Sequence, residues 1–372
     1  MGTCSSTTTN DDKSSSSTPS GTSSCEPPAR RSSAIVTPKA SGNPIVVLTE
    51  HKPSVVELDS RTAQLLSENR EARVSVEPCT GGWRVRPSEV VGTFQVGETR
   101  FVIQPKIPIS NVLALLDVDL GSFRISRQTF EYDSAPDLLI GLIRLFADGL
   151  DTALSQGLRH DYVQRTESLN SIRGRVEFAR LARMPGAEIP TPCRFDEYTA
   201  DVRVNQLLLS AIEIAVRVPG VPPADIVRMR RHLAAFHEVA HHQGPVDWVR
   251  AWVPNRMETH YAPAVRPAAL IVENLTATLA AGRSTGPSFM VDMNRLVEKF
   301  IEVRIGRYLD SGSGLESQAA RWLDVEESIS YRPDLVVTRN GAPVAVADVK
   351  YKALSELKDI DNADLYQAHT YA

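Results

Sequence analysis

The hydrophobic pattern changes twice along the chain, and these changes limit the fold more than any other feature. In residues 44–132, short runs rich in Val, Ile and aromatic residues are separated by Gly, Pro or Ser, as in "EARVSVE" and "ETRFVIQPKI". This spacing is typical of strands, and "QVGETRF" predicts a hairpin with Gly97 in its turn. Residues 133–286 instead show helical spacing, as in "LLIGLIRLFADGLDTAL", and residues 287–372 show a helix, strands and a further helix. We therefore expect an α+β multidomain chain with a small β-rich N-terminal domain, a mostly helical middle region and an α/β C-terminal domain.

Composition sets further limits on the chain. Residues 1–43 are largely Ser, Thr, Pro and Gly, and such a segment buries too little apolar surface to offset its ordering entropy, so a disordered tail is expected. The net charge of −4 argues against a uniformly basic nucleic-acid-binding protein, although a local basic groove is compatible with it. No apolar run is long enough to cross a bilayer. The cysteines are far apart and suggest neither a disulfide framework nor a thiolate zinc site, which favours a reducing, cytoplasmic location: Cys4, Cys25, Cys79 and Cys193.

The first helix of the middle region carries a start signal. Ser134 is the expected N-cap, with Pro136 in the first turn and Asp137 three residues after the cap. The apolar residues that follow leave little polar face, which indicates a buried helix.

The C-terminal region contains two short apolar runs that carry charged side chains. In "RPDLVVTRNGAPVAVADVKYK", Asn340-Gly341 separates the runs and is a strong signal for a two-residue hairpin turn. Asp348 and Lys350 are two apart on a strand, so their side chains project to the same face, and the hairpin brings Asp334 beside them. Either these residues are surface charges on an edge strand, or they form a site.

Two adjacent carboxylates repel each other unless a cation lies between them. Oxygen ligands favour a hard ion such as Mg²⁺, and a neighbouring lysine can stabilise the charge that develops when a phosphodiester is hydrolysed. Glu298, on the helix before the strands, is a candidate third ligand beside Asp334 and Asp348. Gln367 and Tyr371, one helical turn apart on the last helix, are candidates for contacting the substrate backbone.

A second metal motif competes with this interpretation. "HEVAH" fits the HExxH pattern, in which His237 and His241 share one face of a helix and hold Zn²⁺ while Glu238 acts as general base. Asp247 is a candidate third ligand. The alternative is a packed helix, because apolar residues recur at helical spacing along the same segment. A zinc peptidase is thus a minor hypothesis.

The segment "RTESLNSIRGRVEFARLARMP" is rich in arginine, with few acidic residues nearby. These side chains could bind phosphates or the carboxylates of a partner, or they could lie on a solvated helix face and a basic turn: Arg165, Arg173, Arg175, Arg180 and Arg183.

Several blocks together resemble the McrC family, the nuclease subunits of modification-dependent McrBC restriction systems. They occur in the family's order and cover most of the chain after the tail: "LLIGLIRLFADGL", "LRHDYVQRTESLNSIRGRVEF", "CRFDEYTADVRVNQLLLSAI", "MVDMNRLVEKFI", "YRPDLVV", "ADVKYK" and "DLYQAHTYA".

The resemblance implies a C-terminal PD-(D/E)xK restriction-endonuclease-like domain and Mg²⁺-dependent cleavage of modified, 5-methylcytosine-type double-stranded DNA. Asp334, Asp348 and Lys350 would be catalytic, with Glu298 and Gln367 in supporting positions.

The resemblance also implies a partner. That partner would be an AAA+ GTPase resembling McrB, which binds GTP, recognises modified DNA and is stimulated by this chain. Residues 133–286 would dock on it, with Arg173 and Arg175 as candidate partner or phosphate contacts. The chain itself has no P-loop pattern, and the family has no zinc site at the position of HEVAH.

The sequence departs from the family pattern at both ends. The Ser/Thr-rich tail has no counterpart, and the chain ends at Ala372, where nucleases of this class continue with more helix and a further strand. An incomplete nuclease domain is therefore expected, and the alternative function is a non-catalytic activator of the GTPase.

Overall fold

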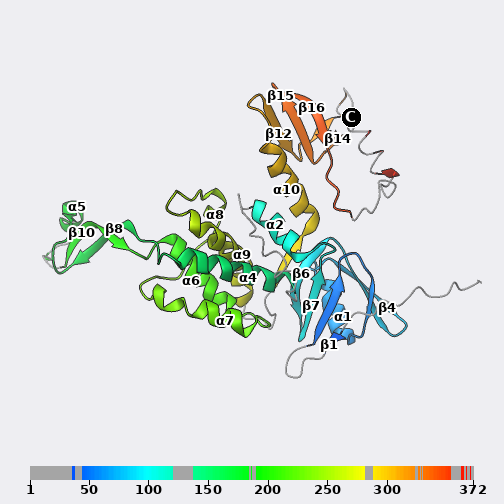
Figure 1. The fold of residues 1–372 in the computed structure, drawn as a ribbon, viewed down its shortest axis with the longest axis horizontal. Helices are drawn as coiled ribbons and strands as arrows, with labels where there is room; N and C mark the ends of the chain where they lie inside the picture. Colours follow the sequence, from blue (N-terminus) through cyan, green and yellow to red (C-terminus); the bar gives the residue numbers. More distant parts are fainter. Residues whose placement is uncertain are drawn as a thin grey trace, which may run out of the picture. The chain divides into compact units, whose positions relative to one another are not determined.

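The computed structural model describes residues 36–37, 44–119, 137–183, 190–280, 288–322 and 330–352, together with a few isolated positions between and after these ranges. The chain divides into two units, Met1–Ser32 and Ser33–Ala372, and all described elements belong to the second (Figure 1). Apart from strand β1 (Val36–Thr37), the tail expected to be disordered lies outside the described residues.

The N-terminal part of the second unit contains a five-stranded sheet with the order β1-β2-β7-β6-β11. Strands β2 (Ile45–Thr49) and β7 (Thr99–Gln104) are parallel, and β6 (Val90–Val96) is antiparallel to β7. The turn between β6 and β7 contains Gly97 with a φ of 59°, which confirms the expected hairpin. The last strand of the sheet, β11 (Phe289–Asp292), pairs with β6 although it lies nearly 200 positions after β6 in the chain. The sheet therefore extends across the expected domain boundary at residue 287.

A three-stranded sheet and one helix complete this β-rich part. The sheet order is β3-β5-β4, with β3 spanning Ser54–Val56, β5 Gly82–Pro87 and β4 Val74–Cys79. Asp59 is the N-cap of helix α1 (Ser60–Glu68), and its carboxylate accepts a hydrogen bond from the Thr62 backbone N–H. Alternate residues of both sheets face a common apolar core.

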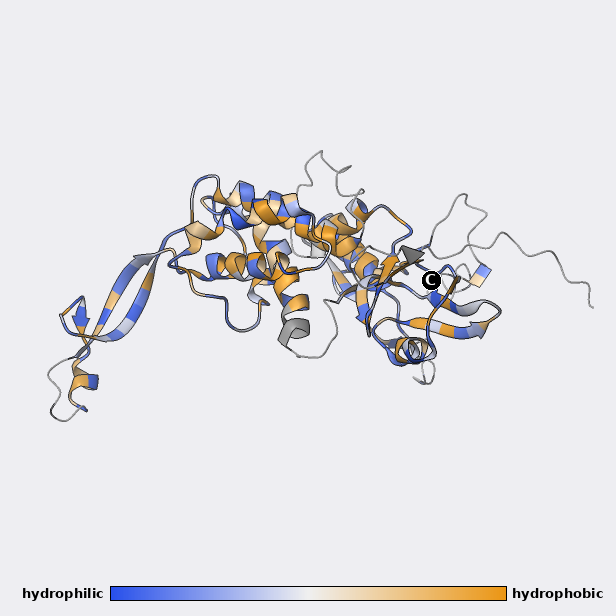
Figure 2. Ribbon diagram, turned by 90° about the horizontal axis from the view of Figure 1, so that it is seen from below, coloured by the Kyte–Doolittle hydropathy of each residue, from blue (hydrophilic) through white to orange (hydrophobic). Residues whose placement is uncertain are grey.

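The middle region is mainly helical, as expected. It comprises α4 (Leu138–Leu154), α6 (Arg203–Ala215), α7 (Pro223–Arg230), the short α8 (Trp248–Ala251) and α9 (Ala262–Ala280), with short 3₁₀ turns at Leu233–Phe236 and Thr259–Tyr261. One further helix, α2 (Ile109–Asp119), lies earlier in the chain, within the segment expected to be β-rich. Helix α4 packs against α9, and α6 also packs against α9. The apolar residues of these helices form the larger core, and apolar colours dominate the packed helices in Figure 2.

The start of α4 differs from the expectation. The N-cap is Asp137 rather than Ser134, and its Oδ1 accepts a hydrogen bond of 2.9 Å from the Ile140 backbone N–H. Its Oδ2 forms a salt bridge of 2.7 Å with Arg100 of β7. Asp137 therefore caps the helix and joins it to the N-terminal sheet, a double role that Ser134 could not fill.

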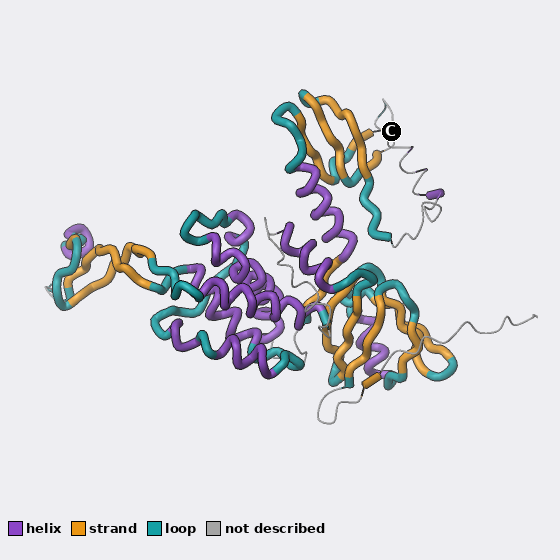
Figure 3. The backbone as a smooth tube through the Cα atoms, in the orientation of Figure 1, coloured by secondary structure: helices purple, strands orange, loops and turns teal. Residues whose placement is uncertain are grey.

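A long β-hairpin interrupts the helical region. Strand β8 (Asp161–Leu169) pairs with β10 (Thr191–Thr199) along its whole length, and β9 (Arg175–Val176) pairs with the other edge of β10. A single helical turn, α5 (Phe178–Leu181), follows β9. The two strands run out from the helices as a ribbon (Figure 3). The arginine-rich segment is thus mostly strand and turn.

The C-terminal part begins with α10 (Met293–Gly306) and continues into a three-stranded antiparallel sheet of order β12-β15-β16. These strands span Ser313–Ser317, Leu335–Arg339 and Ala342–Ala347, and a small pair, β13 (Arg321–Trp322) and β14 (Ser330–Tyr331), lies between the first two in the chain. The assignment of this part to an incomplete PD-(D/E)xK domain remains a prediction. Within the described ranges, no helix combines the length and the hydropathy needed to span a membrane.

Candidate active site

The β15–β16 hairpin brings the two predicted aspartates to one end of a sheet. Asn340 and Gly341 have φ values of 51° and 82°, which is the left-handed geometry of a two-residue turn and confirms the expected hairpin. Leu335 pairs with Ala347, and continuing this antiparallel register by one residue sets Asp334 opposite Asp348. The expected juxtaposition is therefore present.

Hydrogen bonds hold the Asp334 carboxylate in place. Its Oδ2 accepts a 2.8 Å bond from the Val349 backbone N–H, and its Oδ1 accepts a 2.7 Å bond from the side-chain amide of Gln318. Lys350 Nζ lies 2.5 Å from Asp348 Oδ2, and the Asp348 side chain is only 12% exposed. Asp334, Asp348 and Lys350 thus form one cluster of a half-buried carboxylate pair and one cation.

The electrostatics of this cluster favour a bound cation. Burial raises the pKa of Asp348, Lys350 opposes that rise, and the adjacent Asp334 adds to it. Burial also raises the pKa of Glu298, and the charges of Asp334, Asp292 and Asp348 raise it further. The raised pKa values of Asp348 and Glu298 mean that positive charge added beside these carboxylates would stabilise their ionised forms.

The donor set fits Mg²⁺ with two protein ligands. Two carboxylates at one sheet end supply the hard oxygen atoms that Mg²⁺ takes from protein, and water and substrate phosphate supply the rest. In the described part of the chain, no group of three or more His, Cys, Asp or Glu side chains is arranged to hold a metal ion. Asp334 and Asp348 are thus the candidate ligand pair, and the role of Glu298 as a third ligand stays a prediction.

A cavity of about 710 Å³ adjoins the carboxylate cluster. Its lining includes Asp334 and Gln318 from the C-terminal sheet region, and Glu298, Arg295 and Lys299 from α10. The Asp292 carboxylate caps α10 by accepting a 3.1 Å hydrogen bond from the Arg295 backbone N–H. The cavity gives a substrate access to Asp334 and Glu298 together.

Gln367 and Tyr371, the remaining residues predicted near this site, lie outside the described residues. Their role remains a prediction.

Arg173 and Arg175 lie near the end of the hairpin that is farther from the helices. Arg173 contacts Glu197 at 3.4 Å, and its guanidinium stacks 4.3 Å from the centroid of the Phe195 ring. Arg175 is exposed on β9. Large apolar side chains are exposed on the same ribbon, which is typical of an interaction surface: Tyr162, Ile172, Phe178 and Tyr198.

The HEVAH segment does not form the expected helix. Helix α7 ends at Arg230, a 3₁₀ turn covers Leu233–Phe236, and residues 237–243 are irregular. His241 Nε2 lies 2.9 Å from Glu213 rather than beside His237. Without helical spacing, the two histidines do not share a face, so the zinc hypothesis is wrong for this structure.

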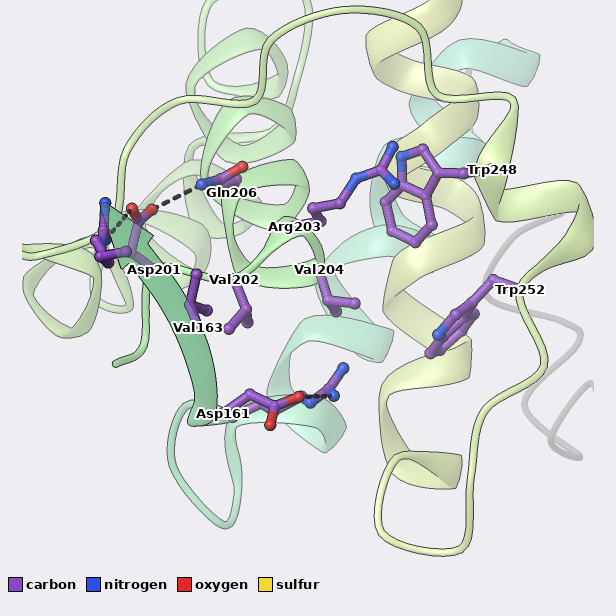
Figure 4. Close-up of a pocket in the computed structure, with 11 residues that line it drawn as sticks. Asp161, Val163, Asp201, Val202, Arg203, Val204, Gln206, Trp248 and Trp252 are labelled. Atoms are coloured by element: carbon purple, nitrogen blue, oxygen red, sulfur yellow. Dashed lines mark hydrogen bonds and ion pairs between the residues drawn. The ribbon is translucent and has the colours of Figure 1, made fainter. Parts of the chain in front are cut away.

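A second cavity, of about 550 Å³, lies where the hairpin joins the helices (Figure 4). Trp248 and Trp252 form one wall, and the Arg203 guanidinium stacks 4.9 Å from the centroid of a Trp248 ring. On the opposite wall, Arg165 of β8 lies 3.2 Å from Asp201, which also accepts a 2.8 Å hydrogen bond from Gln206 of α6. These contacts anchor the hairpin base to the helices. The sequence gives no sign of this arrangement, because its residues are scattered through the chain.

The chain is similar to proteins of one restriction system. A family model described as "McrBC 5-methylcytosine restriction system component" matches residues 85–372. A chain of the refined half-complex from the tetradecameric assembly of Thermococcus gammatolerans McrB AAA+ hexamers with bound McrC has a similar fold, with a TM-score of 0.58 and 20% identity over 88% of this chain and 84% of that chain. The cryo-EM structure of the Thermococcus gammatolerans McrBC complex gives a TM-score of 0.50 and 19% identity over 72% of this chain and 88% of that chain.

No curated protein matches the chain significantly. The likeness to the two solved structures concerns the fold, whereas the family model covers most of the sequence. This chain therefore belongs to the family of McrBC 5-methylcytosine restriction system components.

Proposed function

We propose that the chain is the DNA endonuclease subunit of a modification-dependent restriction complex and corresponds to McrC. The observation that carries this proposal is the meeting of Asp334, Asp348 and Lys350 at one end of the β15–β16 hairpin. A carboxylate pair can hold a divalent ion that activates water for phosphodiester hydrolysis, and an adjacent lysine can stabilise the charge that develops on the phosphate. Membership of the family supports DNA carrying 5-methylcytosine-type modification as the substrate.

Each residue has a distinct role in the proposed reaction. Asp334 and Asp348 would hold Mg²⁺, which when bound supplies an activated water and positive charge beside the scissile phosphate. The Val349 backbone N–H and the Gln318 amide keep the Asp334 oxygen atoms oriented. Lys350 stabilises the negative charge that develops on the phosphoryl oxygens. The raised pKa of Glu298 favours a role as acceptor of the proton from the attacking water.

The partner in this proposal is an AAA+ GTPase resembling McrB, which binds the GTP. One solved structure of similar fold comes from an assembly of McrB AAA+ hexamers with bound McrC, which supports this partner class. Arg173, Arg175 and the exposed apolar residues of the hairpin are the proposed contact surface on this chain. A cytoplasmic location for the complex is part of the same proposal.

The test is cleavage by the reconstituted complex of this chain and its GTPase partner. With methylated DNA, GTP and Mg²⁺, the wild-type complex is expected to cut, and chelating the metal is expected to stop cleavage until Mg²⁺ is restored. Asp348→Asn removes one ligand charge at nearly constant volume, so cleavage should fall by about a thousandfold or more while GTPase stimulation stays unchanged. Glu316→Gln, on β12 of the same sheet, is the matched control and should retain full cleavage. Undiminished cutting by Asp348→Asn would refute the proposal.

The alternative function is that of a non-catalytic activator of the GTPase. This alternative predicts that the wild-type chain stimulates the GTPase of the partner yet yields no cleavage product with any divalent ion. A metal-dependent product that disappears in Asp348→Asn would reject it.

A further inference from the structure

Tyr351, the residue directly after Lys350, is held at both of its polar ends by the N-terminal part of the chain. Its hydroxyl donates a 3.2 Å hydrogen bond to Glu50 Oε2, and its backbone carbonyl accepts a 2.8 Å hydrogen bond from Lys106 Nζ. The same ammonium group lies 3.6 Å from the centroid of the Tyr351 ring. The ring also packs against the larger apolar core.

Glu50 and Lys106 come together because β2 and β7 are parallel. Thr49 and Gln104 are the last paired residues of the two strands, so the chain leaves both strands at the same end of the sheet. The Glu50 side chain is 0% exposed, and its Oε2 also accepts a 3.4 Å hydrogen bond from the Lys106 backbone N–H. Burial raises the pKa of Glu50 and lowers that of Lys106. A buried carboxylate is costly without partners, and Tyr351 supplies one of the few hydrogen bonds that it receives.

The same N-terminal sheet also holds the segment that carries Glu298. Strand β11 pairs with β6, and the Met293 backbone N–H donates a 2.9 Å hydrogen bond to the Glu89 carbonyl. Arg73 bridges the carboxylates of Glu89 and Asp292 at 2.7 Å each. Asp292 in turn caps α10, the helix of Glu298. The N-terminal sheet and the residues at its strand ends thus contact the chain at two places in the candidate active site: next to Lys350, and at the start of the helix that carries Glu298.

We propose that Glu50, Lys106 and Tyr351 form a latch through which the N-terminal sheet positions Lys350 for catalysis. Tyr351 is a positioning residue, because it is bonded directly to Lys350 and both its carbonyl and its hydroxyl are fixed. Holding these two groups restricts the backbone at Lys350 and keeps its ammonium beside Asp348. The inference rests on the proposed nuclease function, and it adds residues from the far end of the chain to the machinery of that site.

The first test is kinetic and uses the reconstituted complex with GTP, Mg²⁺ and methylated DNA. Tyr351→Phe keeps the ring but loses the hydroxyl, and Lys106→Met removes the cation. Because a small displacement of a catalytic group lowers the rate without removing a substrate contact, kcat should fall by about tenfold to a hundredfold while KM for DNA changes by less than about twofold. GTPase stimulation should be unchanged. Tyr308→Phe, at an 80% exposed tyrosine on the same C-terminal part, is the control and should behave as wild type.

A double-mutant cycle separates the latch from general destabilisation. If the two residues act through one network, Tyr351→Phe combined with Lys106→Met should lose much less activity than the product of the two single losses. Glu50→Gln, which removes the buried charge at nearly the same volume, should reproduce the loss in kcat. Multiplicative losses, or a change in KM alone, would overturn the proposal.

Hydrogen exchange of the full-length chain provides a readout that does not depend on cleavage. Loss of the latch should speed exchange in a peptide covering residues 344–352 by about tenfold, with no change in the α4 and α9 peptides. Unchanged exchange at residues 344–352 overturns the latch, as does faster exchange with unchanged kcat. If the wild-type complex fails to cut DNA, the proposed function fails instead, and the exchange result still decides whether the latch exists.

Discussion

At the scale of single residues, Asp151 shows how charge joins two helices of the middle region. It lies on α4, and its Oδ1 is 2.7 Å from Arg231 Nη2 and 2.6 Å from His232 Nε2, next to the end of α7. Arg228 binds the other carboxylate oxygen. Burial raises the pKa of Asp151, but the hydrogen bonds from His232, Arg228 and Arg231 outweigh burial, and the net pKa is lowered. The ionised form therefore stabilises the folded chain.

Replacing Asp151 with Asn should remove the contribution that the ionised carboxylate makes to the free energy of unfolding, together with the pH dependence of that contribution. Since the folded-state pKa is below the ordinary value of about 3.9, the contribution is complete above that value and is lost as the pH falls through the folded-state pKa. The wild type should exceed Asp151→Asn by about 1–2 kcal/mol in free energy of unfolding at pH 7, and the gap should narrow below about pH 4. Urea unfolding at a series of pH values measures this gap. A gap that stays constant down to pH 3.5 would contradict the assignment.

Residue-level prediction from the sequence succeeded where a local pattern fixes the geometry. The Asn340-Gly341 turn sets the register of its own hairpin, so the meeting of Asp334 and Asp348 followed from thirteen intervening residues alone. Glu50, Lys106 and Tyr351 have no such signal. Their contacts join positions 245 and 301 apart, and each residue alone is an ordinary polar side chain in a strand or loop.

At the scale of elements, helices with a continuous apolar face were predictable and the exposed hairpin was not. Helices α4, α6 and α9 bury apolar residues at helical spacing, which the sequence displays directly. All residues of β8 are exposed or half-buried, so the alternation of buried and exposed residues that marks a half-buried strand is absent. For the HEVAH segment the sequence predicted an element that is not present. The segment matches a helical motif, but α7 ends at Arg230 and the chain at HEVAH is irregular.

The hairpin should be removable without unfolding the chain. Arg165 and Phe195 are paired across β8 and β10, so residues 166–194 can be replaced by an Asn-Gly turn at that register. Neither apolar core includes a described residue of the deleted segment, and the melting temperature should change by less than about 3 °C. GTPase stimulation of the partner should fall to background, since Arg173, Arg175 and two of the four exposed apolar residues of the proposed contact surface are removed.

A paired variant tests the same surface more finely. Arg173→Glu with Arg175→Glu reverses two charges and should reduce GTPase stimulation by about tenfold or more, because like charges at an interface repel. Arg86→Glu, an arginine of the β-rich part, is the control. Full stimulation by the truncated chain would show that the partner binds elsewhere.

At the scale of the whole molecule, the boundaries in the sequence pattern are not boundaries of the fold. The expected C-terminal domain starts at residue 287, yet its first strand, β11, completes the N-terminal sheet, and α10 packs against α2. A strand of four residues, Phe289–Asp292, gives too little pattern to be identified, and its partner β6 is far away in the sequence. Sequence periodicity identifies elements, but pairing between distant short strands depends on packing that no local window contains.

The pairing of β6 with β11 can be tested at Gly92, where substitution by Ala adds a single Cβ atom. Its φ of 132° suits glycine alone, and a Cβ there would lie 2.0 Å from the Phe289 carbonyl oxygen of β11. Gly92→Ala must therefore push β11 from β6 or strain the backbone, at a cost of about 1–3 kcal/mol in free energy of unfolding by urea. Gly306→Ala, where the nearest atom would be 3.9 Å away, should change stability by less than about 1 kcal/mol.

The functional consequence of Gly92→Ala follows from the path of the chain. Strand β11 leads directly into Asp292 and α10, so loosening it shifts the helix that carries Glu298 while the hairpin of Asp334 and Asp348 keeps its own contacts. We expect cleavage by the reconstituted complex to fall by about tenfold or more at a temperature where the variant remains folded, with GTPase stimulation retained. Equal loss of both activities would instead mean that the N-terminal sheet supports the whole molecule rather than the orientation of α10.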